Sequence, residues 1–162
     1  MIIRQATPDD AAEMAVLLNE IIRVGGTTAF QKETTVEAMQ GFIRKLQTTG
    51  FIHVASDHET DTLLGYQSLE SYPDLPKTLG IIATFAKVGS TTRGIGTALF
   101  AATRQAAPAL GFTELDATIR ADNTGGLAYY SKMGFVDHSI AKAVPLDDGT
   151  LVDRISKRLK LI

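Results

Sequence analysis

The chain has 162 residues with 16 basic and 18 acidic side chains, and 44% of its residues are hydrophobic. This length and composition predict one globular domain over residues 1–162, and the net charge of −2 argues against a nucleic-acid binder. Because cysteine is absent, disulfides, thiolate metal sites and a cysteine nucleophile are excluded. With no apolar run of membrane-spanning length and no signal-peptide pattern, we expect a cytoplasmic protein that binds no membrane.

A short strand and a long amphipathic helix are predicted at the start of the chain. Ile2-Ile3 indicates the strand, and the run Thr7-Pro8-Asp9-Asp10 is typical of a helix N-terminus. Apolar residues then recur every three or four positions as far as Val24, and Gly25-Gly26 ends the helix.

A second helix and a β-hairpin follow in the sequence. Thr34 and Glu37 match a capping box, which predicts a helix with Thr34 as its cap and Gly50 as its end. Residues 51–55 and 63–69 lie on either side of a polar turn, and they predict two antiparallel strands.

The middle of the chain predicts a buried strand that leads into a helix. Residues 79–88 are apolar and partly β-branched, so we expect a central strand buried on both faces. The run Gly94-Ile95-Gly96 opens a helix, and Pro108 kinks or ends its last turn before Gly111. The residues expected to point inward from this helix are Leu99, Ala102, Ala106 and Leu110.

The last third predicts a strand over 112–119, a short helix over 123–133 and strands over 135–144 and 150–161. Asp147-Asp148-Gly149 is a strong hairpin turn between the last two strands. The predicted order is β-α-α-β-β-β-α-β-α-β-β, which indicates an α/β (α+β) domain with a mixed sheet.

A glycine-rich turn over residues 88–97 joins the buried strand to the helix. Gly94 and Gly96 permit positive φ angles and a close approach of the backbone to a ligand. The helix that follows adds free N–H groups, so the turn predicts a phosphate or pyrophosphate site. The spacing excludes the Walker A and Rossmann fingerprints, and the alternative is a flexible turn that binds nothing.

Two motifs resemble those of the GNAT family of N-acetyltransferases. The family pattern Arg/Gln-x-x-Gly-x-Gly/Ala matches residues 91–96 at both glycines, with Thr91 in place of Arg or Gln. A second pattern, Asn-x-x-Ala-x-x-Phe/Tyr-Tyr-x-Lys-x-Gly-Phe, matches residues 123–135, with Gly126 in place of Ala. The resemblance also covers the opening residues 3–10, and it implies a mostly antiparallel, twisted mixed sheet with helices on both faces.

The resemblance implies direct transfer of an acetyl group from acetyl-CoA to an amine within a ternary complex, without a metal. In the family the central strand splays at a bulge, and the pantetheine arm fills the gap. The residues expected to hold pantetheine and the thioester carbonyl through their backbone are Phe85, Ala86 and Val88. The residues expected to hold the pyrophosphate through N–H groups are Arg93, Gly94, Ile95, Gly96 and Thr97.

Two side chains in the second motif are expected to act on the cofactor. Tyr130 matches the family tyrosine that faces the thioester sulfur and donates a proton to the leaving thiolate, whereas the alternative is an aromatic that packs the core. Asn123 matches a residue that bonds the pantetheine arm, but its type also suits a helix cap. The Arg93 side chain either contacts a CoA phosphate or lies in solvent.

The general base and the acceptor pocket are less strongly encoded. Glu70 is the first choice for a base, with Glu33, Asp116 and ordered water as alternatives. The run Gly25–Gln31 resembles a loop of phosphinothricin-type acetyltransferases and predicts acceptor contacts. The residues concerned are Thr27, Thr28 and Phe30, unless the loop is a polar connector with Phe30 as a plug.

We therefore expect an acetyl-CoA-dependent N-acetyltransferase that acts on the primary amine of a small molecule. Two alternatives stay open, namely a non-catalytic acetyl-CoA-binding module and an enzyme that acetylates a protein amino group. The exposed edge of the final hairpin would support a homodimer, which is common in the family.

Overall fold

The computed structural model describes residues 1–161. The strands are β1 (Ile2–Gln5), β2 (Gly50–Ser56), β3 (Leu63–Glu70), β4 (Leu79–Ala86), β5 (Glu114–Arg120), β6 (Val136–Pro145) and β7 (Leu151–Lys160). The helices are α1 (Ala11–Val24), α2 (Val36–Thr49), α3 (Ile95–Ala106) and α4 (Thr124–Lys132), with 3₁₀ turns η1 (Pro8–Asp10) and η2 (Ala107–Leu110). This order confirms the predicted element order and fold class.

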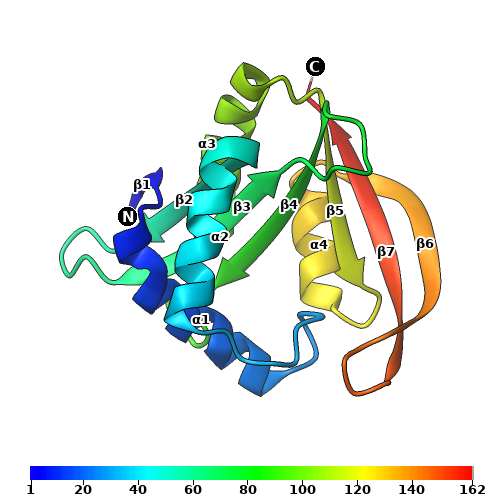
Figure 1. Ribbon diagram of the computed structural model, residues 1–162, viewed down its shortest axis with the longest axis horizontal. Helices are drawn as coiled ribbons and strands as arrows, with labels where there is room; N and C mark the ends of the chain where they lie inside the picture. Colours follow the sequence, from blue (N-terminus) through cyan, green and yellow to red (C-terminus); the bar gives the residue numbers. More distant parts are fainter. Residues whose placement is uncertain (162) are drawn as a thin grey trace.

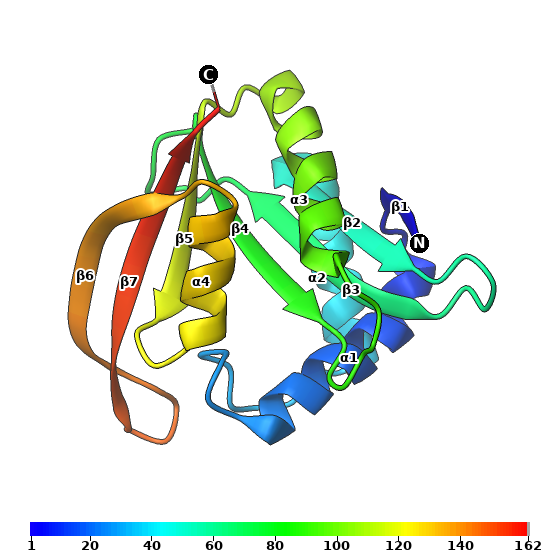
Figure 2. The ribbon, with the colours of Figure 1, turned by 180° about the vertical axis from the view of Figure 1, so that it is seen from behind.

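The strands form a 7-stranded sheet in the order β1-β2-β3-β4-β5-β7-β6, in which only β4 and β5 pair in parallel. Helices α1 and α2 cover one face of the sheet, and α3 and α4 cover the other (Figures 1 and 2). On the first face, Met14 and Ile43 pack with Tyr66 of β3. On the second face, Phe100 packs with Leu115 and Tyr130. Apolar residues at helical spacing therefore pack against both faces of the sheet.

Strand β4 departs from the prediction of a strand buried on both faces. It ends at Ala86 rather than Val88, and it pairs with β5 only from Leu79 to Ile81. Beyond Ile81 the two strands diverge, and α4 lies behind the gap (Figure 1). The pairing of β4 with β3 continues in regular register to Ala86, so the strands splay without a bulge on that side.

Two local predictions were wrong, namely the cap residue of α2 and the inward orientation of Leu110. The cap of α2 is Thr35, whose Oγ1 accepts from the Ala38 N–H at 3.1 Å. The backbone N–H and carbonyl oxygen of Thr34 are instead hydrogen-bonded to the side chain of Asn19. The predicted effect of Pro108 is confirmed, because α3 ends at Ala106 and η2 follows. Leu110, expected to point inward, is 52% exposed because the 3₁₀ turn rotates it away from the inner side of α3.

Strand β6 forms one edge of the sheet, and almost all of its residues are exposed. Val136 and Ile140 are among its exposed apolar residues. An edge of this kind is open to pairing with another strand, and a homodimer stays a prediction. Within residues 1–161, no helix is long and apolar enough to cross a membrane.

Candidate active site

The gap between β4 and β5 presents backbone groups that no strand pairs. The Lys87 N–H donates to the Leu64 carbonyl oxygen at 2.8 Å, and hydrogen-bonded pairs alternate along an antiparallel ladder. Phe85 is therefore bonded to β3, whereas the backbone groups of Thr84 and Ala86 face the gap. The Ala86 backbone is therefore free toward the gap and the Phe85 backbone is engaged with β3, and the contacts of both residues with pantetheine stay predictions. Val88 lies beyond the end of β4 in an exposed turn.

The glycine-rich turn offers consecutive free N–H groups at the start of α3. Within residues 1–161, the backbone N–H groups from Arg93 to Thr97 have no acceptor, and the first helical bond of this end runs from Ala98 to Gly94. Gly94 has φ of +78°, a left-handed conformation that favours glycine. Free N–H groups at a helix N-terminus bind anions, so this turn fits a pyrophosphate. The Arg93 side chain is exposed beside it.

Gly96 has a packing role that the sequence did not predict. Its φ is not positive, and a Cβ added to it would lie 2.7 Å from Cε1 of Tyr129. The Tyr129 hydroxyl donates to the Gly96 carbonyl oxygen at 2.7 Å. Gly96 therefore lets the Tyr129 ring of α4 pack directly on the first turn of α3. Its predicted contact with pyrophosphate through the backbone N–H stays a prediction.

Tyr130 lies at the gap but inside the second core. Its side chain is 6% exposed, its ring packs edge-on against Phe135, and its hydroxyl is 2.8 Å from Oγ1 of Thr84. Burial raises the pKa of Tyr130, so the phenol keeps its proton at neutral pH. The ring therefore packs the core, and the role of the hydroxyl as proton donor stays a prediction.

Two polar residues in the gap were missed by sequence reasoning. Gln67 of β3 is fully buried, and its Nε2 donates to Thr84 Oγ1 at 2.8 Å and to the Tyr129 hydroxyl at 3.2 Å. Thr84 in turn contacts Tyr130. Each of these residues is a polar side chain within a mostly apolar strand. Burial of a polar side chain is unfavourable unless it is hydrogen-bonded, so this pattern could have indicated a buried hydrogen-bond network.

Asn123 caps α4 and reaches the loop that follows α1. Its Oδ1 accepts from the Gly126 N–H at 2.9 Å, and its Nδ2 donates to the Thr27 carbonyl oxygen at 3.2 Å. A Cβ at position 126 would lie 2.5 Å from this Nδ2, which explains why glycine suits this position better than the alanine of the family pattern. A hydrogen bond from Asn123 to pantetheine stays a prediction. It would use a side chain that already bonds Thr27 and Gly126.

The loop between α1 and α2 lies below the open end of the gap (Figure 1). Nη1 of Arg120 donates to the Thr28 carbonyl oxygen at 3.1 Å, and Gln31 accepts from the Asp148 N–H at 2.8 Å. The loop is thus tied to β5 and to the β6–β7 turn, as well as to Asn123. Phe30 is 57% exposed, so it is not a buried plug. Contacts of Thr27, Thr28 and Phe30 with an acceptor stay predictions.

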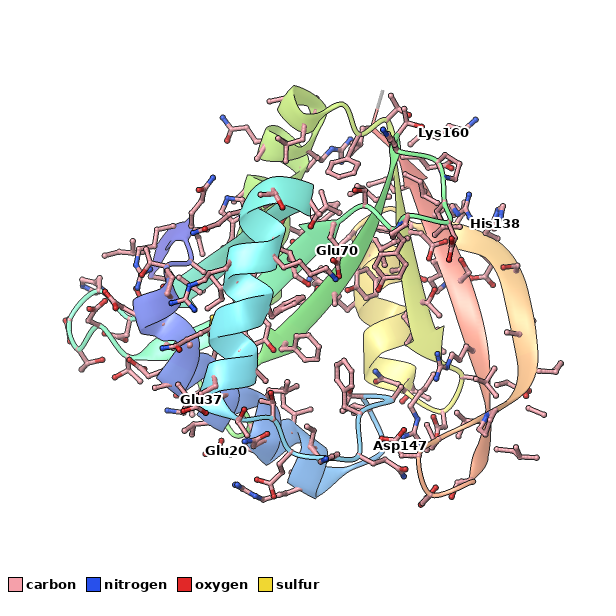
Figure 3. The ribbon with its side chains drawn as sticks, viewed as in Figure 1. Glu20, Glu37, Glu70, His138, Asp147 and Lys160 are labelled. Atoms are coloured by element: carbon pink, nitrogen blue, oxygen red, sulfur yellow. The ribbon has the colours of Figure 1, made fainter. Side chains whose placement is uncertain are left out.

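The three candidate bases have different surroundings. Asp116 is buried and accepts from Ser156, from Thr118 at 2.9 Å and from Nε of Arg158 at 2.7 Å, and Glu33 is paired with Arg23. Glu70 lies on the α2 side of the sheet, opposite Ile81 at the closed end of the gap (Figure 3). Its Oε2 is buried without a hydrogen bond, 3.4 Å from Nζ of Lys45. Within residues 1–161, Glu70 is the candidate that is buried without a side-chain hydrogen bond.

No group of three potential metal-binding side chains lies together within residues 1–161. The three histidines are therefore not assembled into a metal centre in this part of the chain. His53 is buried in β2, and His58 lies in the turn after it.

The sequence profile of the acetyltransferase (GNAT) domain matches residues 1–136. The splayed sheet with its glycine-rich turn therefore belongs to an acetyltransferase. The chain is a member of the GNAT family of acetyltransferases, which confirms the resemblance and the predicted enzyme class. No curated protein matches the sequence.

Solved structures share the whole fold at low sequence identity. An N-acetyltransferase from Staphylococcus aureus Mu50 superposes with a TM-score of 0.89 at 19% identity, covering 99% of this chain and 98% of the other. A ribosomal-protein-alanine N-acetyltransferase from Brucella melitensis gives 0.89 at 18% identity, covering 99% of each chain. A phosphinothricin acetyltransferase from Sinorhizobium meliloti, solved with acetyl-CoA, gives 0.88 at 20% identity, covering 98% and 87%.

Proposed function

We propose that this enzyme transfers the acetyl group of acetyl-CoA to the primary amine of a small molecule by direct attack. The observation that carries the proposal is the gap between β4 and β5, which leads from unpaired strand groups to the free N–H groups of residues 93–97. The extended pantetheine arm of acetyl-CoA, which is joined to a pyrophosphate, matches this order of strand groups followed by free N–H groups. Related structures support it, because the Sinorhizobium meliloti enzyme was solved with acetyl-CoA.

The residues at the gap supply the steps of acetyl transfer. The amine nitrogen attacks the thioester carbonyl carbon, and a backbone N–H of β4 that faces the gap stabilises the oxyanion. The C–S bond then breaks, and its electron pair on sulfur takes a proton from the Tyr130 hydroxyl. The nitrogen loses its own proton, which restores the phenol through the base or solvent.

Glu70 is our choice for the base that accepts the proton from the amine. It lies on the face opposite Tyr130, so acid and base act from opposite sides of the sheet. The loop tied to Arg120 and Asn123 lies across the open end of the gap and supplies contacts to the acceptor. An ordered water that relays the proton to Glu70 is the alternative to direct contact.

Two other activities remain candidates for the same site. Acetylation of a protein amino group is favoured by the likeness to the ribosomal-protein-alanine enzyme, although that likeness establishes only the fold. A binding module without catalysis is favoured by Thr91 in place of the Arg or Gln of the family pattern, since a side-chain contact is lost.

The test measures CoA release from acetyl-CoA with a panel of small amines and with peptides that carry a free N-terminal amine. Turnover with a small amine that exceeds turnover with every peptide by tenfold or more supports the proposal. Preference for a peptide supports the protein-directed alternative. Acetyl-CoA binding without turnover on the full panel supports the binding module, and failure to bind acetyl-CoA contradicts all three.

A further inference from the structure

Gln67, Thr84 and two tyrosines of α4 form a continuous chain of hydrogen bonds at the gap. Gln67 and Thr84 are directly opposite on β3 and β4, so both side chains project from the α3–α4 face. The chain runs from the Gly96 carbonyl oxygen through Tyr129, Gln67 and Thr84 to Tyr130. Each of these bonds is 2.7–3.2 Å long.

The direction of the chain is fixed at its Gly96 end. A backbone carbonyl oxygen only accepts, so the single hydroxyl hydrogen of Tyr129 is donated to Gly96. The Tyr129 oxygen is then an acceptor, and the atom of Gln67 that lies 3.2 Å from it has to be the amide nitrogen. This orients the amide of Gln67, whose oxygen has no partner within residues 1–161.

The hydrogen bonds from Gln67 to Tyr130 also have a defined direction. The second N–H of the amide donates to Thr84 Oγ1, and the hydroxyl hydrogen of Thr84 has the Tyr130 oxygen as its acceptor at 2.8 Å. Thr84 also lies near the Tyr129 oxygen, but its contact with hydrogen-bond geometry is the one with Tyr130. If Tyr130 donated instead, the Thr84 hydrogen would lose this acceptor in a half-buried site, which is unfavourable.

We propose that Gln67 and Thr84 are positioning residues that keep the hydroxyl hydrogen of Tyr130 unpaired and directed at the departing sulfur. The inference rests on the proposed function and assigns a cause to the donor role of Tyr130. When the C–S bond breaks, the sulfur takes the bonding electron pair and the phenol proton. The proton given up by the amine then neutralises the phenolate, so the residues end the cycle unchanged.

The test compares Thr84→Val, which keeps the shape and removes the hydroxyl, with Thr84→Ser, which restores it. Thr84→Val is expected to lower kcat for CoA release at least tenfold and to change the KM for acetyl-CoA by less than threefold. Thr84→Ser is expected to keep at least a third of the wild-type kcat. Gln67→Met, which removes the amide that sets the direction, is expected to give a kcat between those of Thr84→Val and the wild type.

The activities of the wild type and the variants distinguish a failure of this inference from a failure of the proposed function. If the wild-type enzyme releases CoA and Thr84→Val keeps kcat within twofold, the inference is wrong and the proposed function stands. The same holds if Thr84→Ser loses as much activity as Thr84→Val, because packing then explains both. If the wild type releases no CoA with any amine, both fail. Thermal unfolding of each variant is measured first, and Thr84→Ala replaces Thr84→Val if that variant does not fold.

Discussion

Asn123 and Thr27 are joined by a hydrogen bond of 3.2 Å from Nδ2 to the carbonyl oxygen, although 96 positions separate them in the chain. The same side chain caps α4 through Oδ1. One amide therefore ties the loop after α1 to the helix that carries Tyr130. The position of this loop and the placement of α4 are thereby linked through a single side chain.

Asn123→Asp separates the two roles of this amide. A carboxylate still accepts from the Gly126 N–H and suits the positive end of the helix dipole, but it cannot donate to Thr27. We expect a small loss of stability, because a carboxylate oxygen then faces the Thr27 carbonyl oxygen, and a KM for the acceptor raised severalfold. Asn123→Ala loses the cap as well, at a cost of about 1 kcal/mol in the free energy of unfolding. A rise confined to the KM for acetyl-CoA would instead indicate the predicted pantetheine contact.

Gly96→Ala tests the packing of Tyr129 on α3. The added Cβ would meet the ring at 2.7 Å, and overpacking of this kind costs about 1–3 kcal/mol of unfolding free energy. In a Tyr129→Ala background the ring is gone, and we expect the same substitution to be neutral or stabilising, since alanine favours helix more than glycine. Equal destabilisation in both backgrounds, measured by urea unfolding, would contradict this explanation of Gly96.

The sequence predicted features that depend on neighbouring residues better than features set by distant contacts. The end of α3 before Pro108 and the turn at Gly149 follow from local backbone chemistry. Thr34 and Thr35 both suit a helix cap, and the choice of Thr35 depends on the contact of Thr34 with Asn19. Such a contact has no local signature.

In the candidate site too, features set by neighbouring residues were predicted and features set by distant contacts were missed. The free N–H groups at the glycine-rich turn were predicted from spacing, because a helix N-terminus always leaves them unpaired. The partial exposure of the second half of β4 was missed by the hydrophobic pattern, because an apolar sequence does not reveal that β5 diverges after Ile81; only the family resemblance implied a splayed strand. Gln67 and Tyr129 were missed because their roles depend on how α3 and α4 pack together.

Asp116→Asn distinguishes a structural carboxylate from a base. Both oxygens of its carboxylate already accept hydrogen bonds, from Thr118 on one side and from Ser156 and Arg158 on the other. We expect a loss of about 1.5–3 kcal/mol in unfolding free energy, as for hydrogen bonds to charged groups, with kcat unchanged. Glu70→Gln is the matched comparison and should lower kcat at least tenfold with little loss of stability. The reverse pattern would make Asp116 the base.

His53 makes stability depend on pH. Burial lowers the pKa of His53 below the value of about 6.5 that it has in an unfolded chain. The unfolded state therefore binds a proton that the folded state does not, and the free energy of unfolding falls as the pH drops from about 7 to 5. We expect His53→Gln to weaken this dependence, with His58→Gln in the exposed turn as control. Equal dependence in His53→Gln and the wild type, by urea unfolding at both pH values, would contradict the prediction.

Tyr130 is the proposed proton donor to the leaving sulfur, and acetyl transfer depends most on this step. The direct measurement is kcat for CoA release at saturating acetyl-CoA and amine, compared between the wild type, Tyr130→Phe and Tyr129→Phe. We predict that Tyr130→Phe loses at least tenfold in kcat with its KM for acetyl-CoA within threefold, and that Tyr129→Phe loses less. A Tyr130→Phe enzyme with the wild-type kcat would contradict the account.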